Sequence, residues 1–189
     1  MFIIWSISLL GALGQLGTVS SSTTLEPWEV ASIRTFSPPY SPGINLSSGI
    51  AFTISDPNTL EAGPAHRGTA IFPPSTANCS GSWTDEGQAY NKPFSCTEVP
   101  YGYWSFEIRK PATGYASPMT HFDVRFHRVC NVTVIGSVYS KVFAGQQHFE
   151  VGQNMQGLCG ASGICSFQLK NESAPVMVTQ EMESCSGAC

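Results

Sequence analysis

The segments Trp104-Ser-Phe-Glu-Ile108 and Phe122-Asp-Val-Arg-Phe-His127, both within the stretch 96–135, decide how this chain is expected to fold. Apolar and polar residues alternate strictly in each segment. Because alternate side chains of a strand share one face, the apolar members are expected to form one buried layer of Trp104, Phe106, Ile108, Phe122, Val124 and Phe126. Burying such a layer contributes roughly 9–18 kcal/mol before the cost in conformational entropy. The two segments therefore predict a core hairpin or a pair of adjacent strands.

Short strands are also expected along the rest of the chain. Apolar alternation predicts them over 28–36, 50–54, 69–72, 76–83, 166–170 and 175–182. The first of these strands is expected to carry a bulge between Val30 and Ile33, where the alternation is imperfect.

Glycines and polar stretches mark the expected breaks between strands. The β-branched segment 132–143 predicts one strand broken near Gly136, or two short strands, before a turn at Gly145 and a strand over 148–151. Segment 59–68 is expected to be an exposed loop, and 152–163 an irregular glycine-rich segment. About eight to eleven short strands and no helical periodicity predict an all-β, single-domain β-sandwich or β-barrel stapled by disulfides.

The N-terminal segment and the composition indicate where the protein works. Residues 1–16 are almost wholly apolar and are followed by small residues. This pattern predicts a signal peptide over 1–21 and a secreted β-domain over 22–189, with a buried N-terminal strand or helix as the alternative. The apolar run is short for a membrane span, so no membrane association is expected after signal removal. The net charge is −4, and nine scattered Lys and Arg residues form no basic patch, so no nucleic-acid partner is expected.

Cysteine usage agrees with an oxidising compartment. All seven cysteines lie in the expected mature domain, and none forms the CxxC spacing of zinc and redox sites. Two pairings have a local rationale, because Cys159 and Cys165 flank a glycine-rich turn and Cys79 and Cys96 flank a polar excursion. Closing a loop of the latter size is worth about 3 kcal/mol. One of the three others, Cys130, Cys185 and Cys189, is expected to be free or intermolecular.

Four Asn-x-Ser/Thr sequons are candidate glycosylation sites: Asn45, Asn78, Asn131 and Asn171. Each becomes a glycan only where it is exposed in a secretory compartment. Asn78 precedes a cysteine expected in a disulfide, and Asn131 falls within an expected strand.

Several stretches, taken in order, resemble the small fungal secreted proteins of the Alternaria major-allergen-like class. They are Trp28-x-Val30, Phe52-Thr-Ile-Ser-Asp-Pro-Asn-Thr59, Cys79 shortly before Trp83, Cys96-Thr97, Trp104-Ser-Phe-Glu107, Phe122-Asp-Val-Arg-Phe-His127 and Cys159-Gly-Ala-Ser-Gly-Ile-Cys165. The resemblance implies a β-barrel or β-sandwich without known catalysis, an effector-like or allergen-like role, and a disulfide-linked homodimer. The additional cysteines Cys130, Cys185 and Cys189 depart from the pattern of that class.

No catalytic or metal motif stands out in the sequence. His121 and His127 share a strand face, but six residues of strand separate them by about 20 Å, so no metal site and no cofactor are expected. A glycosidase needs two carboxylates about 5–9.5 Å apart, and Asp85, Glu86, Glu107 and Glu150 could supply them only if folding brings two together.

Exposed aromatic side chains can stack on sugar rings, and three tyrosines could form such a ligand-binding strip: Tyr90, Tyr101 and Tyr103. Packing at a sheet edge with wet hydroxyls is the alternative. The sequence therefore predicts a non-enzymatic, secreted, effector-like or allergen-like protein that binds a host protein, a small ligand or a cell-wall carbohydrate. The alternative is a cell-wall-active glycoside hydrolase that uses dispersed carboxylates.

Overall fold

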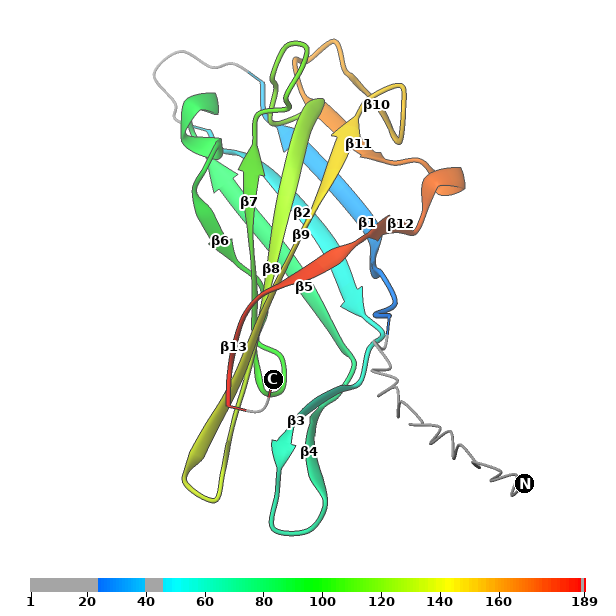
Figure 1. Ribbon diagram of the computed structural model, residues 1–189. Coiled ribbons are helices and arrows are strands. Elements are labelled where there is room, and N and C mark those ends of the chain that lie inside the picture. The colour runs from blue at the N-terminus through cyan, green and yellow to red at the C-terminus, as the bar shows by residue number, and fades with distance from the viewer. Residues whose placement is uncertain (1–23, 40–45, 188) are drawn as a thin grey trace, which may run out of the picture.

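Antiparallel strands dominate the computed structural model, which describes residues 24–39, 46–187 and 189 (Figure 1). The expected signal peptide and the sequon at Asn45 lie outside the described residues. The first sheet has the order β10 (Met155–Cys159), β11 (Cys165–Leu169), β1 (Trp28–Ser37), β2 (Ser48–Asp56) and β5 (Ser75–Trp83), and β12 (Val176–Val178) also pairs with β1.

The second sheet has the order β13 (Gln180–Ser186), β9 (Ser137–Glu150), β8 (His121–Val134), β7 (Gly102–Arg109) and β6 (Pro93–Ser95). A separate hairpin consists of β3 (Leu60–Pro64) and β4 (Thr69–Phe72). The described helices are the short 3-10 turns η1 (Glu86–Ala89) and η2 (Asn171–Ser173). Within this described part of the chain, no helix has the length and apolar character needed to cross a membrane. The all-β, disulfide-stapled fold expected from the sequence is confirmed.

The expected apolar layer is the inner face of the β7–β8 pair. All six of its members are at most 1 % exposed, and Phe106 lies directly opposite Phe126 in the register. Rings from the first sheet close on this layer, because the centroids of Phe52 and Phe106 and those of Trp28 and Trp104 are each 4.7 Å apart. The two sheets therefore share one aromatic core, as in a sandwich (Figure 1).

Both seams between the two sheets are bridged. At one seam the Cys79–Cys96 disulfide and a backbone bridge link β5 to the segment that follows β6. At the other seam, β12 pairs with β1 of the first sheet, and the chain continues directly into β13, which pairs with β9 of the second sheet. A disulfide with a backbone bridge thus links the two sheets on one side, and a crossing of the chain links them on the other.

The strand expected over 175–182 is therefore two strands in different sheets, which is a correction to the sequence prediction. The turn expected at Gly145 is also wrong, because β9 runs unbroken through this residue to Glu150. Gly145 lies where the chain changes sheets, and a Cβ there would be 2.8 Å from the carbonyl oxygen of Thr179. A glycine allows this close approach of two backbones.

The structure also bears on the predicted bulge, the predicted break near Gly136 and the two segments predicted to lack strands. The bulge in β1 falls between Val30 and Ser32, as expected. The break near Gly136 is a tight hairpin, in which Ile135 and Gly136 both have positive φ. The loop expected over 59–68 is wrong, because it contains β3, whose Leu60 is buried. The segment 152–163 likewise contains β10, which raises the total to thirteen described strands.

The seven cysteines all lie within the described residues. The expected pairs Cys79–Cys96 and Cys159–Cys165 are confirmed, and Cys185 pairs with Cys189. Cys130 carries a free thiol that is buried in the core, and this burial raises its pKa. A disulfide-linked homodimer stays a prediction, and this structure presents no exposed free thiol for it.

Candidate functional site

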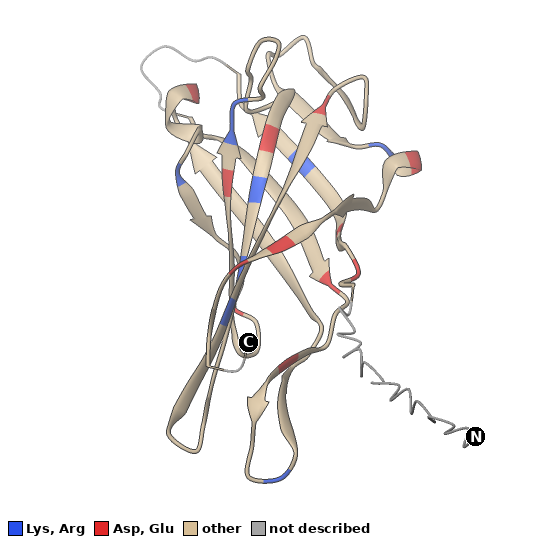
Figure 2. Ribbon diagram, viewed as in Figure 1, with Lys and Arg blue, Asp and Glu red and all other residues tan. Residues whose placement is uncertain are grey.

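A hollow of about 590 Å³ lies on the outer face of the first sheet and is called here the sheet hollow. Alternation along β1, β2 and β5 turns the apolar residues inward and leaves small polar side chains outside. The lining includes Ser32, Arg34, Thr53, Asn78, Thr97 and Gln168. Among the described lining residues Arg34 alone carries a charge, and Figure 2 shows how sparse charges are on these strands.

Hydrogen bonds hold part of this lining in place. The Thr53 hydroxyl donates to Asn78 Oδ1 at 2.9 Å, and the Asn78 backbone N–H donates to Thr97 Oγ1 at 3.0 Å. Arg34 Nε donates to the Ser166 hydroxyl at 3.3 Å. The neighbouring Cys79–Cys96 disulfide fixes one wall of the hollow. The surface thus presents preorganised hydroxyl, amide and guanidinium groups.

The described sequon asparagines Asn78, Asn131 and Asn171 are all exposed. Asn78 and Asn171 line the sheet hollow, whereas Asn131 lies on β8. A glycan attached to either of the first two would therefore compete with a ligand for this surface.

The three tyrosines expected to form a strip are not brought together. Tyr101 and Tyr103 are 51 % and 50 % exposed at one end of β7. Tyr90 bridges to Ile108 near the other end of that strand, which places it about 17 Å from Tyr103 along the sheet. The Tyr90 hydroxyl is buried and lacks a hydrogen-bond partner among the described residues. Its desolvation, with a further contribution from the Glu86 charge, raises the pKa of Tyr90 to about 12.

The acids considered for sugar hydrolysis lie on three elements, with Asp85 and Glu86 at η1, Glu107 on β7 and Glu150 on β9. Asp85 caps η1 by accepting from the Gly87 N–H at 2.8 Å. Glu107 forms an ion pair with Arg109 at 3.0 Å. Glu107 aligns across the sheet with Gln146, and Glu150 lies four residues further along β9, about 13 Å away along the strand alone. This separation exceeds the range that a glycosidase pair requires.

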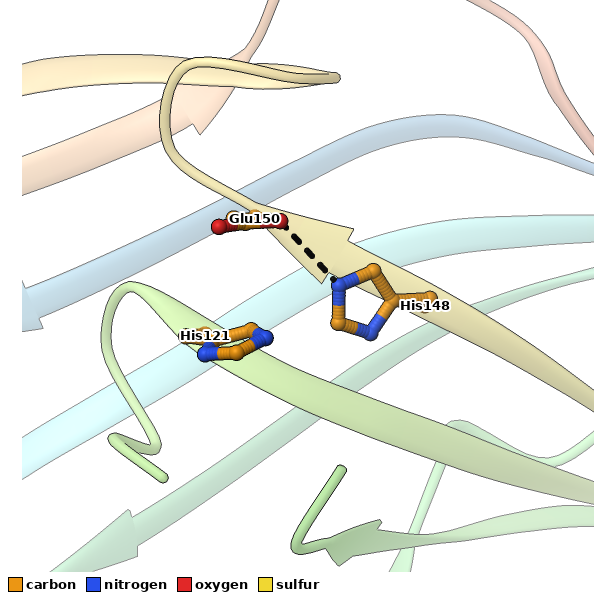
Figure 3. A group of neighbouring side chains, drawn as sticks. All are labelled: His121, His148 and Glu150. Atoms are coloured by element: carbon orange, nitrogen blue, oxygen red, sulfur yellow. Dashed lines mark ion pairs between the residues drawn. The ribbon is translucent and has the colours of Figure 1, made fainter. Parts of the chain in front are cut away.

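A cluster that the sequence analysis did not predict lies at the end of the second sheet, and we call it the His–Glu cluster. It consists of His121, His148 and Glu150, each of which offers one ligand atom, and these atoms all lie within 4.8 Å of one another (Figure 3). The register of β8 and β9 creates it, because His121 pairs with Glu150 and Asp123 pairs with His148. The cluster opens into a hollow of about 520 Å³ that the 111–114 segment also lines.

Each histidine of this cluster has a defined setting. His121 is 8 % exposed, and the segment before β8 folds over it, because a Cβ on Gly114 would come within 2.7 Å of the imidazole. His148 Nδ1 lies 2.6 Å from Asp123 Oδ1, and its Nε2 lies 3.5 Å from Glu150 Oε2. Asp123 and Glu150 are therefore neighbours, but the imidazole of His148 occupies the space between them.

Two short motifs in the sequence contribute the residues of this cluster. His121-x-Asp123 and His148-x-Glu150 each place two polar residues on one strand face. His127, which shares the strand face of His121, instead lies 3.4 Å from Glu183 of β13. The alignment of the two motifs depends on strand pairing, which this pattern does not specify.

Comparisons of the chain with protein-family models, with curated proteins and with solved structures found no match. The resemblance to the Alternaria major-allergen-like class therefore stays a prediction.

Proposed function

We propose that this chain is a secreted, non-enzymatic, effector-like or allergen-like protein that acts by binding, and that the sheet hollow is its ligand surface. The observation that carries the proposal is the hollow itself, a concave sheet face with fixed hydrogen-bonding groups. Concave sites with a few convergent polar groups are the usual form of ligand sites. Three disulfides and the apolar N-terminal segment support secretion.

A cell-wall carbohydrate is the ligand class that suits this lining best. Hydroxyl and amide side chains both donate and accept hydrogen bonds, as sugar hydroxyls do. A single guanidinium from Arg34 gives little reason to expect a strongly charged ligand. The described lining contains no exposed tyrosine or tryptophan for ring stacking, so affinity for a glycan would depend on hydrogen bonds and shape.

The test is co-sedimentation of the purified, secreted protein with separate wall polysaccharides, namely chitin, β-1,3-glucan, cellulose and pectin. The protein is enzymatically deglycosylated first, because Asn78 and Asn171 border the surface. Ala51→Trp fills the hollow from an exposed position at the centre of β2. Thr133→Trp adds the same side chain at an exposed position of β8, outside the hollow, and is the matched control.

We expect one of these polysaccharides to retain the wild-type protein and the Thr133→Trp variant, and to lose Ala51→Trp. Retention of Ala51→Trp at the wild-type level would remove the sheet hollow as the ligand surface. Failure of all four polysaccharides to retain the wild type would reject the carbohydrate ligand. Release of soluble sugar during incubation would contradict the non-enzymatic assignment.

A further inference from the structure

The His–Glu cluster has an arrangement that the binding proposal does not use. His148 is held between two carboxylates, with Asp123 on Nδ1 and Glu150 on Nε2. The contact with Asp123 is 2.6 Å, which is hydrogen-bond distance, so this carboxylate fixes the proton on Nδ1. Nε2 of His148 lies 3.5 Å from Glu150 Oε2, and this oxygen also accepts a hydrogen bond from Gln153 Nε2. A cation at this position would be within reach of both the imidazole and the carboxylate.

His121 contributes an unsatisfied nitrogen group from the neighbouring strand. Its side chain is 8 % exposed, and its Nδ1 is buried without a hydrogen-bond partner among the described residues. Leaving a buried polar group unpaired costs about 1–3 kcal/mol. Figure 3 shows a ring nitrogen of His121 directed toward His148, with Glu150 on the adjacent strand. A ligand bound by the His121 imidazole would offset this cost of leaving its nitrogen unpaired.

We propose that His121, His148 and Glu150 bind one divalent transition-metal ion, and that Zn²⁺ is the ion that fits them. Two imidazoles with one carboxylate form a common zinc donor set, whereas Ca²⁺ and Mg²⁺ require oxygen ligands. Ligand atoms about 2.0–2.2 Å from a tetrahedral Zn²⁺ lie roughly 3.3 Å from each other. The 3.5 Å between His148 Nε2 and Glu150 Oε2 is close to this value. All three ligand atoms lie within 4.8 Å of one another, so closing them around the ion requires a small side-chain movement.

The surroundings of the cluster match those of a metal site. Histidines that bind metals usually donate the other ring N–H to a carboxylate, which orients the ring and raises its basicity. Asp123 provides this contact to His148 and is itself held by Gln146 Nε2 at 2.9 Å. The hollow beside the cluster leaves the fourth coordination position accessible to water. The ion would connect the ends of β8 and β9, beneath the segment that covers His121.

The test measures Zn²⁺ binding to the tag-free, full-length secreted protein after removal of metals with a chelator. Competition with a chromophoric indicator gives the stoichiometry and affinity, and Co²⁺ substitution gives a visible spectrum that reports the coordination geometry. The ligand variants are His148→Ala and Glu150→Gln, and Asp123→Asn removes the orienting carboxylate. His127→Ala is the matched control, because His127 lies on the same face of β8 but contacts Glu183 instead.

We expect one Zn²⁺ per chain in the wild type and in His127→Ala, and loss of this binding in both ligand variants. Asp123→Asn should weaken binding by about 10–100-fold without abolishing it. Circular dichroism of each variant checks that the fold persists, and a rise in melting temperature with Zn²⁺ should appear only where the ion binds. Absence of stoichiometric Zn²⁺ binding to the wild type, or binding that survives in both folded ligand variants, would overturn the proposal. Neither result bears on the sheet hollow, which is a separate surface.

Discussion

Single buried polar groups show how the burial of one residue changes its chemistry. Tyr90 packs against the core beside η1, and its hydroxyl is buried without a partner among the described residues. Desolvation, followed in size by the effect of the Glu86 charge, raises the pKa of Tyr90 to about 12. In an unfolded chain the tyrosine pKa is about 10. The folded protein therefore holds this proton more tightly than the unfolded chain does.

The difference in Tyr90 pKa predicts a loss of stability at alkaline pH. Between about pH 10 and pH 12 the unfolded chain has released the Tyr90 proton and the folded protein has not. The folded state binds more protons in this window, so its stability is fully present below pH 10 and falls as the pH rises. We expect Tyr90→Phe to remove this contribution to the decline, and to be neutral or stabilising by up to about 1 kcal/mol at pH 7.

Urea denaturation between pH 8 and pH 11 measures this effect, with Tyr115→Phe as the control. Tyr115 is 68 % exposed, so its substitution should leave the wild-type alkaline decline in place. An identical pH dependence in Tyr90→Phe and the wild type would show that the buried hydroxyl does not act in this way.

At the scale of the elements, the passage from β12 to β13 carries the chain from one sheet to the other. Val176–Val178 pairs with β1 and Gln180–Ser186 pairs with β9, so the change of sheet occurs at Thr179. The crossing brings this backbone against Gly145 of β9, which is buried. A close approach of this kind leaves no space for a Cβ, and the glycine is therefore a packing requirement.

Gly145→Ala is expected to destabilise the protein by about 1–3 kcal/mol, as overpacking of a core does. The added Cβ would lie 2.8 Å from both the Thr179 carbonyl oxygen and Val178 Cγ1, and a backbone atom cannot move aside as a flexible side chain does. Gly160→Ala is the control, because its Cβ would have its nearest neighbours at 3.7 Å. Thermal or urea unfolding of both variants measures the difference, and equal stabilities would contradict the proposed role of the crossing.

At the scale of the whole molecule, a buried ion pair joins the two sheets through the core. Arg128 of β8 and Asp56 of β2 are each 2 % exposed and are paired by NH1 and Oδ2. Arg128 also donates to the Pro73 carbonyl at 3.0 Å and lies over the Trp104 ring. Asp56 accepts further hydrogen bonds from the N–H and the side-chain amide of Asn58. Burial lowers the pKa of Arg128 from its ordinary value by desolvation, and the surrounding acceptors compensate for that cost.

Removing one member of this pair should lower the free energy of unfolding far more than removing both charges. We expect Arg128→Met to cost about 3–5 kcal/mol, because it leaves the Asp56 carboxylate buried without its counter-charge. Adding Asp56→Asn should restore much of that loss, since the amide carries no charge. Chemical denaturation of both single variants and the double variant gives the coupling energy. A loss below about 1 kcal/mol in Arg128→Met, or strictly additive effects, would argue against the pair as the link between the sheets.

Local patterns in the sequence were sufficient to predict the strands of the core and two of the disulfides. The six residues of the apolar layer are recognisable because the alternation of side chains along a strand is a local property. The pairs Cys79–Cys96 and Cys159–Cys165 are likewise near in sequence, with separations of 17 and 6 residues. The bulge in β1 and the break near Gly136 also follow from nearby residues.

The candidate sites, in contrast, were decided by the tertiary structure. The His–Glu cluster requires β8 and β9 to pair so that His121 faces Glu150, and a shift of one residue would move either strand's polar residues to the other face. The sheet hollow combines side chains of β1, β2, β5 and β11, whose order in the sheet is not their order in the chain. The need for glycine at position 145 also depends on the tertiary structure, because the segment that packs against it, at Thr179, is distant in sequence. By itself, the sequence determined the buried face of the core strands β7 and β8, because the burial of that layer follows the local alternation. Only the tertiary structure decided which strands became neighbours, because register and crossing depend on contacts between residues far apart in the chain.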